Sequence, residues 1–172
     1  MNKEIVNKVA KSGLVTIDFL DYTPNAPILE FDIKNILFEG VVLKEKDFRS
    51  SLKEITLSNY ENKIIALFCS TDTIIPMWAY MLIVSYLNPV SSCIYFGTKK
   101  EVLQKKILEN ISKIDARAFE GKKVIVKGCA KIPISESLYV AITAKLQNSV
   151  SSLMFGEACS AVPVYKKKKN ES

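Results

Sequence analysis

Short apolar runs alternate with helical patterns along most of the chain after residue 63. Residues 64–68, 92–96, 124–126 and 152–155 form runs of strand length. Residues 74–87, 101–111 and 135–146, which lie between these runs, carry apolar side chains in helical segments. Strands that are apolar along their length and alternate with helices predict a parallel sheet that is covered on both faces.

The first third of the chain has a different order of elements. We expect a helix over residues 3–12, strands over 14–19, 28–31 and 41–43, and a helix over 45–55. A last short strand is expected over residues 161–165. The predicted fold is therefore α/β, with three layers, a mostly parallel sheet, helices on both faces and an antiparallel N-terminal edge.

Length and composition are those of one globular domain. The chain has 172 residues, of which 48% are hydrophobic and 24% are charged. Since no linker or low-complexity segment divides it, we predict a single α/β domain over residues 1–165 and a basic disordered tail over residues 166–172. The start of the chain lacks the pattern of a signal peptide, and the cysteines are widely spaced, so a cytoplasmic location is expected.

The net charge of +6 does not by itself predict a nucleic-acid partner. Lys166 to Lys169 form a terminal run, and without that run the net charge is only about +2. Phosphate-binding glycine motifs are also missing from the sequence. The apolar helix expected over residues 74–87 is shorter than the ~20 residues that cross a bilayer. We therefore expect neither a nucleic-acid nor a membrane partner.

Three cysteines follow predicted strands. Cys69, Cys129 and Cys159 each come just after an apolar run, and parallel strands of one sheet would bring their sulfur atoms to the same edge. Thiolates are good zinc ligands, and three ligands with one open position are typical of catalytic zinc. The expected cofactor is therefore zinc, held by these three cysteines.

Two acidic residues lie close in sequence to the cysteines. Glu157 and Asp72 could complete the metal sphere or act as a base on a metal-bound water, so they are the candidate catalytic residues. An iron–sulfur cluster with one open iron fits the same three cysteines. No Cys-x-x-Cys pair occurs, and the cysteines could instead be small apolar residues at buried positions. For Cys93, inside a predicted strand, burial is the expected role.

Several segments carry a resemblance to a known family. They are Ile5–Ala10, Lys44–Arg49, Trp78–Leu82, Val126–Cys129 and Gly156–Ser160. In these segments the chain resembles a bacterial family catalogued as a domain of unknown function (number 2480). The resemblance implies a single-domain cytoplasmic protein in which the cysteine segments belong to the characteristic pattern. It implies no activity.

Three functions remain open from the sequence. The first is a metal-assisted hydrolase or lyase acting on a small-molecule substrate that the sequence does not identify. The second is a redox or iron–sulfur protein. The third is a non-catalytic binding or scaffold domain whose cysteines are structural or only buried. A homodimer is a candidate form of such a domain. The absence of histidine from the sequence excludes Ser-His-Asp and Cys-His catalysis.

Overall fold

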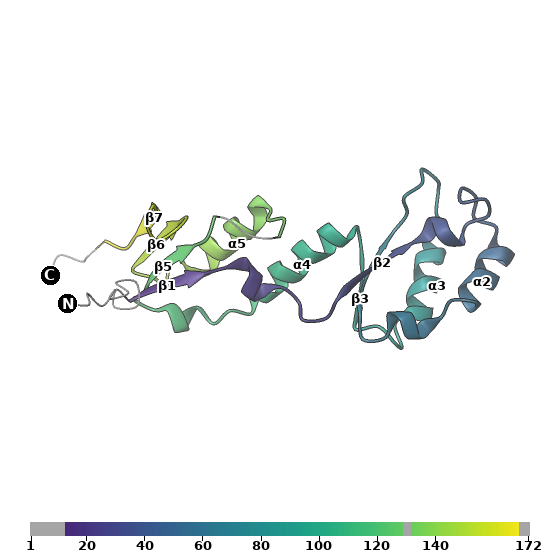
Figure 1. Ribbon diagram of the computed structural model, residues 1–172, viewed down its shortest axis with the longest axis horizontal. Coiled ribbons are helices and arrows are strands. Elements are labelled where there is room, and N and C mark those ends of the chain that lie inside the picture. The colour runs from purple at the N-terminus through teal and green to yellow at the C-terminus, as the bar shows by residue number, and fades with distance from the viewer. Residues whose placement is uncertain (1–12, 129–131, 169–172) are drawn as a thin grey trace, which may run out of the picture. The chain divides into compact units, whose positions relative to one another are not determined.

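The chain divides into two compact units. A computed structural model describes residues 13–128 and 132–168. Residues 24–103 form one unit, called here the inserted unit, and residues 1–23 together with 104–172 form the other, called the split unit. The boundary at residues 103/104 falls inside helix α4, Lys99–Ser112. No linker marks this boundary because a continuous helix crosses it (Figure 1).

The inserted unit contains a three-stranded parallel sheet with the order β2-β3-β4. Its elements in chain order are β2 (Ile28–Asp32), the 3-10 helix η2 (Ile33–Ile36), α2 (Glu45–Lys53), η3 (Leu57–Tyr60), β3 (Ile64–Phe68), α3 (Met77–Leu87) and β4 (Cys93–Phe96). Each strand is joined to the next by a helical crossover, as parallel pairing requires.

Alternation along β3 separates the two faces of this sheet. Ile65 and Leu67 pack with the buried residues of α2 and α3 in one core cluster. Ile64 and Ala66 pack with Val102 of α4 in another. Because successive side chains of a strand point to opposite faces, both faces of β3 are covered, one by α2 and α3 and the other by Val102 near the start of α4. The continuous apolar character of β3 follows from this double burial.

The split unit contains a four-stranded sheet with the order β1-β5-β6-β7. Its elements are β1 (Leu14–Ile17), η1 (Phe19–Tyr22), the part of α4 from Gln104 onward, η4 (Ala116–Phe119), β5 (Lys123–Val126), α5 (Glu136–Leu146), β6 (Ser152–Phe155) and β7 (Val162–Lys166). The first three strands are parallel, and β7 pairs antiparallel to β6.

The two units repeat one plan. Helices α3 and α5 differ by 59 positions at both ends, and so do strands β4 and β6 and the helices η3 and η4. The same turn precedes β3 and β5: Asn62 donates to Val90 O and Gly121 donates to Ser149 O, each at 2.9 Å. Both donors have positive φ, 57° and 68°, a conformation that Asn and Gly adopt more readily than other residues.

Buried positions repeat at the same spacing of 59. The matching pairs are Phe48 and Ile107, Leu52 and Ile111, Ile83 and Ile142, and Leu87 and Leu146, and all eight side chains are almost fully buried. The first strands and the 3-10 helices that follow them depart from this spacing, because β1 and β2, and likewise η1 and η2, start 14 positions apart. The split unit is therefore a second βαβαβ module, and the inserted unit lies in sequence between its η1 and the part of α4 from Gln104 onward.

Most of the predicted elements are confirmed, and so is the mostly parallel α/β fold. Three details were wrong. The parallel strands belong to two sheets, and the antiparallel pair is at the C-terminal edge, β6 with β7. Residues 41–43 form no strand, only an isolated bridge between Phe38 and Val42. Strands β1 and β2, which were expected at an antiparallel N-terminal edge, each pair in parallel within a separate sheet.

Two further predictions concern the ends of the chain. The helix expected over residues 3–12 lies outside the described residues, as do positions 169–172 of the predicted tail. Lys166 ends β7, so the strand extends into the segment predicted to be tail. The single domain expected over residues 1–165 stays a prediction.

Candidate functional site

The predicted thiolate site draws on both units. Cys69 follows β3 in the inserted unit, where it is half-buried and its thiol donates to Thr71 O at 3.6 Å. Cys159 is exposed after β6 in the split unit, and Cys129 lies outside the described residues. Because β3 and β6 belong to different sheets, the shared sheet edge that led to this prediction is not present. The site itself stays a prediction.

The acidic residues proposed for catalysis are both exposed. Asp72 lies in the loop before α3, and Glu157 follows β6. In the described ranges no three metal-binding side chains gather into a group that could hold an ion. Cys93 is half-buried in β4 and packs against the cluster of Ile64, Ala66 and Val102, in line with its expected structural role.

The C-terminal edge of the inserted sheet carries a hydrogen-bonded acid. Asp32, the last residue of β2, accepts from Lys34 N and Ser70 N at 3.0 Å each and from Ser70 Oγ at 2.5 Å. Partial burial disfavours the charged form, but these hydrogen bonds and the nearby Lys34 outweigh it and hold the pKa of Asp32 below 3.8. Asp32 caps η2 and ties β2 to the loop after β3.

The split unit has the equivalent acid. Asp18 caps η1 through Leu20 N at 3.0 Å and forms an ion pair with Lys127 Nζ at 2.9 Å. The amide of Leu20 and then the ammonium of Lys127 hold the pKa of Asp18 below 3.8. Asp18 in turn raises the pKa of Lys127, with a smaller contribution from Glu157. Both acids therefore have a structural role: each caps a 3-10 helix and links it to a loop elsewhere in the same unit.

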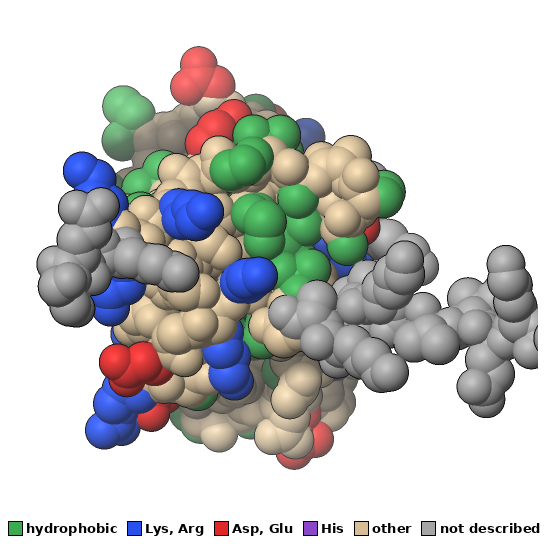
Figure 2. Space-filling model, turned by 90° about the vertical axis from the view of Figure 1, so that its left-hand side faces the viewer, with side chains coloured by type: hydrophobic (Ala, Val, Ile, Leu, Met, Phe, Trp, Pro, Cys, Tyr) green, Lys and Arg blue, Asp and Glu red, His purple; other side chains and the backbone are tan. Residues whose placement is uncertain are grey.

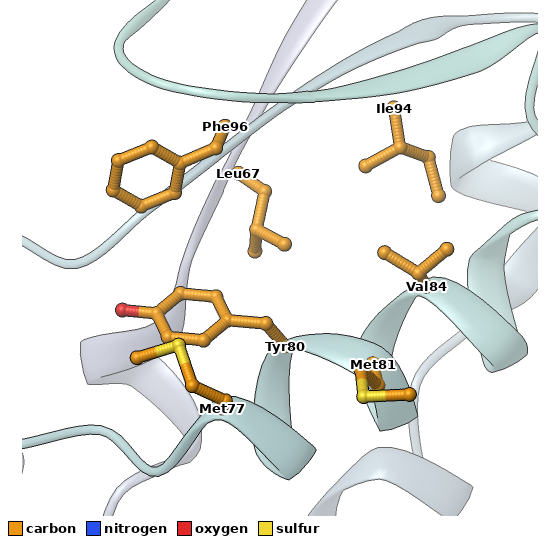
Figure 3. Close-up of a pocket in the computed structure, with 7 residues that line it drawn as sticks. All are labelled: Leu67, Met77, Tyr80, Met81, Val84, Ile94 and Phe96. Carbon is orange, nitrogen blue, oxygen red and sulfur yellow. The ribbon is translucent and has the colours of Figure 1, made fainter.

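An apolar groove lies on the inserted unit between α3 and the sheet. It has a volume of about 490 Å³. Its lining residues are Leu67, Met77, Tyr80, Met81, Val84, Ile94 and Phe96. Figure 3 shows the sheet residues Leu67, Ile94 and Phe96 on one side and the α3 residues on the other.

Helix α3 forms one wall because it is apolar on both of its sides. Ala79, Ile83 and Leu87 are fully buried on its inner side. On the outer side, Met77 is 73% exposed and Met81 is 72% exposed. A helix that is apolar all round is normally buried on all sides. In α3 the outer side is exposed instead, so its apolar surface is available to a binding partner.

Tyr80 is the polar residue of the groove lining. Its ring packs edge-on against Phe96, with centroids 5.7 Å apart, and burial, followed by the charge of Cys69, raises the pKa of the Tyr80 hydroxyl. From Ile64 to Thr98 the one charged residue in the sequence is Asp72, which is exposed and does not line the groove. The groove therefore offers packing surface and one neutral hydroxyl.

The comparisons with known proteins identify a family. The family described as "Protein of unknown function (DUF2480)" matches residues 3–167. The chain belongs to this family. No curated protein and no solved structure matches the chain. Membership of DUF2480 thus confirms the expected resemblance over nearly the whole chain and leaves the activity to be argued from the structure.

Sequence reasoning did not single out the groove in this DUF2480 protein. It interpreted residues 74–87 as a centrally buried helix, which is true of its inner side. The sequence contains two signals of the groove. The first is the pair Met77 and Met81, four positions apart on the outer side of the helix. The second is a repeat at a spacing of 59 positions, in which Tyr139 and Phe155-Gly156 match Tyr80 and Phe96-Gly97. Among the described helices, none is both long and apolar enough to cross a membrane.

Proposed function

We propose that this protein is a non-catalytic binding protein, and that the groove on the inserted unit docks an apolar segment of a partner protein. The observation that supports this proposal is the pair of exposed methionines, Met77 and Met81, on a groove without a charged lining residue. Contiguous exposed apolar surface in a soluble protein is typical of interaction sites. Methionine side chains adapt to varied apolar partners.

The chemistry of the lining favours binding over catalysis. Of the side chains in the groove, the Tyr80 hydroxyl alone is a conventional proton donor, and its raised pKa keeps it neutral at physiological pH. A general acid or base is most effective when its pKa lies near the operating pH. The groove can therefore hold an apolar group, and its lining provides little means of transforming one.

Titration with 8-anilino-1-naphthalenesulfonate, an anionic dye whose aromatic rings fluoresce when they bind apolar surface, tests whether the groove is an accessible binding surface. We expect Met81→Glu to weaken dye binding to the full chain about fivefold or more, because a carboxylate in the groove would have to be desolvated. The matched control is Val140→Glu, since Val140 holds the equivalent position on α5 and is 68% exposed. Equal dye binding by the wild-type protein and Met81→Glu would contradict the proposal.

A further inference from the structure

The groove has a smaller counterpart in the split unit, which is lined in part by a residue of β7. There Tyr139 of α5 packs edge-on against Phe155 of β6, with centroids 5.5 Å apart. These are the positions of Tyr80 and Phe96 in the inserted unit, whose rings are 5.7 Å apart. The pocket of the split unit is lined by Val126, Tyr139, Thr143, Leu153, Met154, Phe155 and Val164. Apart from Met154 and Val164, each is 59 positions from a lining residue of the groove.

Strand β7 supplies Val164, the lining residue that has no counterpart in the inserted unit. It pairs antiparallel to β6, with Val162 opposite Phe155 and Tyr165 opposite Leu153. With β7 in place, the pocket of the split unit has a volume of about 210 Å³, against about 490 Å³ for the groove. The repeated module thus has a place beside its third strand where an antiparallel strand packs over the aromatic pair.

In the described part of the inserted unit, β4 pairs with β3, and no described strand takes the place that β7 takes on β6. We infer that the apolar segment docked by the inserted unit is an extended strand of a partner protein, which adds antiparallel to β4 as β7 adds to β6. This inference rests on the proposed function and names the form of the ligand. Strand addition of this kind takes affinity from main-chain hydrogen bonds and specificity from the pocketed side chains.

The differences between the groove and the pocket of the split unit indicate which side chains the partner strand must carry. The α5 counterparts of Met77, Met81 and Val84 are Glu136, Val140 and Thr143. The groove is accordingly more apolar and larger than the pocket that Val164 helps to line. We expect the partner strand to place an apolar side chain larger than valine, such as leucine or phenylalanine, over Tyr80, with no acidic residue on that face.

A peptide with the sequence of residues 161–167, Ala-Val-Pro-Val-Tyr-Lys-Lys, serves as the probe because it contains the whole of β7. Fluorescence anisotropy of the labelled peptide with the full chain measures its binding. Replacing the valine that corresponds to Val164 by phenylalanine should tighten binding at least about threefold, and replacing it by glutamate should weaken binding by about tenfold.

Protein variants assign the bound peptide to one unit. Met77→Glu introduces the residue that α5 carries at its equivalent position, Glu136, so the variant should fold. We expect Met77→Glu and Met81→Glu to weaken peptide binding about tenfold. The control Val140→Glu should leave binding within about twofold of the wild-type value, because no charge then enters the groove. Equal weakening by Val140→Glu would place the peptide on the split unit and overturn the inference.

Other outcomes separate the inference from the proposed function. If the peptides do not bind while Met81→Glu still reduces dye binding, the strand inference fails and the apolar docking site stands. If Met81→Glu changes neither peptide binding nor dye binding, both the strand inference and the proposed function fail. Sedimentation of the protein alone gives the last outcome: self-association that Met81→Glu abolishes would identify a second copy as the occupant and would overturn the inference of a partner strand.

Discussion

Asp18 and Asp32 occupy one structural position in two modules. Asp18 directly follows β1 and Asp32 is the last residue of β2, and each accepts a hydrogen bond from the backbone amide two residues later. They differ in their second partner, which is the Lys127 ammonium for Asp18 and Ser70 for Asp32. The same capping role is thus stabilised by an ion pair in one unit and by a hydroxyl in the other.

The lowered pKa of Asp18, caused first by the Leu20 amide and then by Lys127, predicts a pH-dependent stability. The folded-state pKa of Asp18 is lowered, so its contribution is present above the unfolded pKa near 3.8 and is lost as the pH falls through the folded value. We expect Asp18→Ala to lower the free energy of unfolding by about 1 kcal/mol at pH 7. Urea denaturation should show this difference shrinking below about pH 4. If the free energies of unfolding of wild type and Asp18→Ala differ by the same amount down to pH 2.5, this account is contradicted.

Ser70 predicts a local change at the other acid. Ser70→Ala removes one donor from Asp32 but leaves both backbone amide donors in place. We expect the pKa of Asp32 to rise toward its ordinary value, because a hydrogen bond to the charged form is lost while burial stays the same. Carboxyl carbon NMR titration measures this pKa. An unchanged value would mean that the hydroxyl does not hold the carboxylate.

The thiolate hypothesis is also tested at single residues. It requires zinc, or iron in the cluster alternative, in the freshly purified protein, and loss of that metal in Cys129→Ser. Cys93→Ser is the matched control because Cys93 packs in the core cluster of its own unit. Elemental analysis gives the answer directly. Equal metal content in wild type and Cys129→Ser would remove Cys129 from the site.

At the scale of elements, α3 and α5 share an inner side and differ on the outer one. Ile83 and Leu87 correspond to Ile142 and Leu146, and all four are fully buried. Their spacing could be recognised in the sequence because apolar residues at helical spacing indicate the buried face of a helix. The outer residues were not assigned to a surface, since an exposed methionine and a buried one look the same in a single sequence. The helices were therefore predictable, and the groove was not.

This contrast predicts two classes of substitution in α3. Met77→Glu combined with Val84→Thr reproduces outer residues of α5, so we expect the free energy of unfolding to change by less than about 1 kcal/mol. Leu87→Ala truncates a fully buried side chain and should lower it by about 3 kcal/mol. Chemical denaturation of both variants measures the difference. Comparable losses in the two variants would show that the outer side of α3 is part of the core.

At the scale of the whole molecule, the sequence predicted a parallel α/β fold but assigned all strands to one sheet. Local patterns specify each strand, whereas strand order depends on contacts between distant segments, which a single sequence does not reveal. The 59-position repeat would have revealed two modules. By this repeat Cys69 matches Gly128 and Cys129 matches Ser70, so the cysteines do not hold equivalent positions in the two modules.

The place of the inserted unit in the chain also affects folding during synthesis. Strand β1 leaves the ribosome before the inserted unit, yet it pairs with β5, and Asp18 forms its ion pair with Lys127 across a separation of 109 residues. The residues of the inserted unit are all translated between these two strands. A nascent chain must therefore keep β1 unpaired while the whole intervening module emerges. During that interval the newborn protein exposes an apolar segment to chaperones.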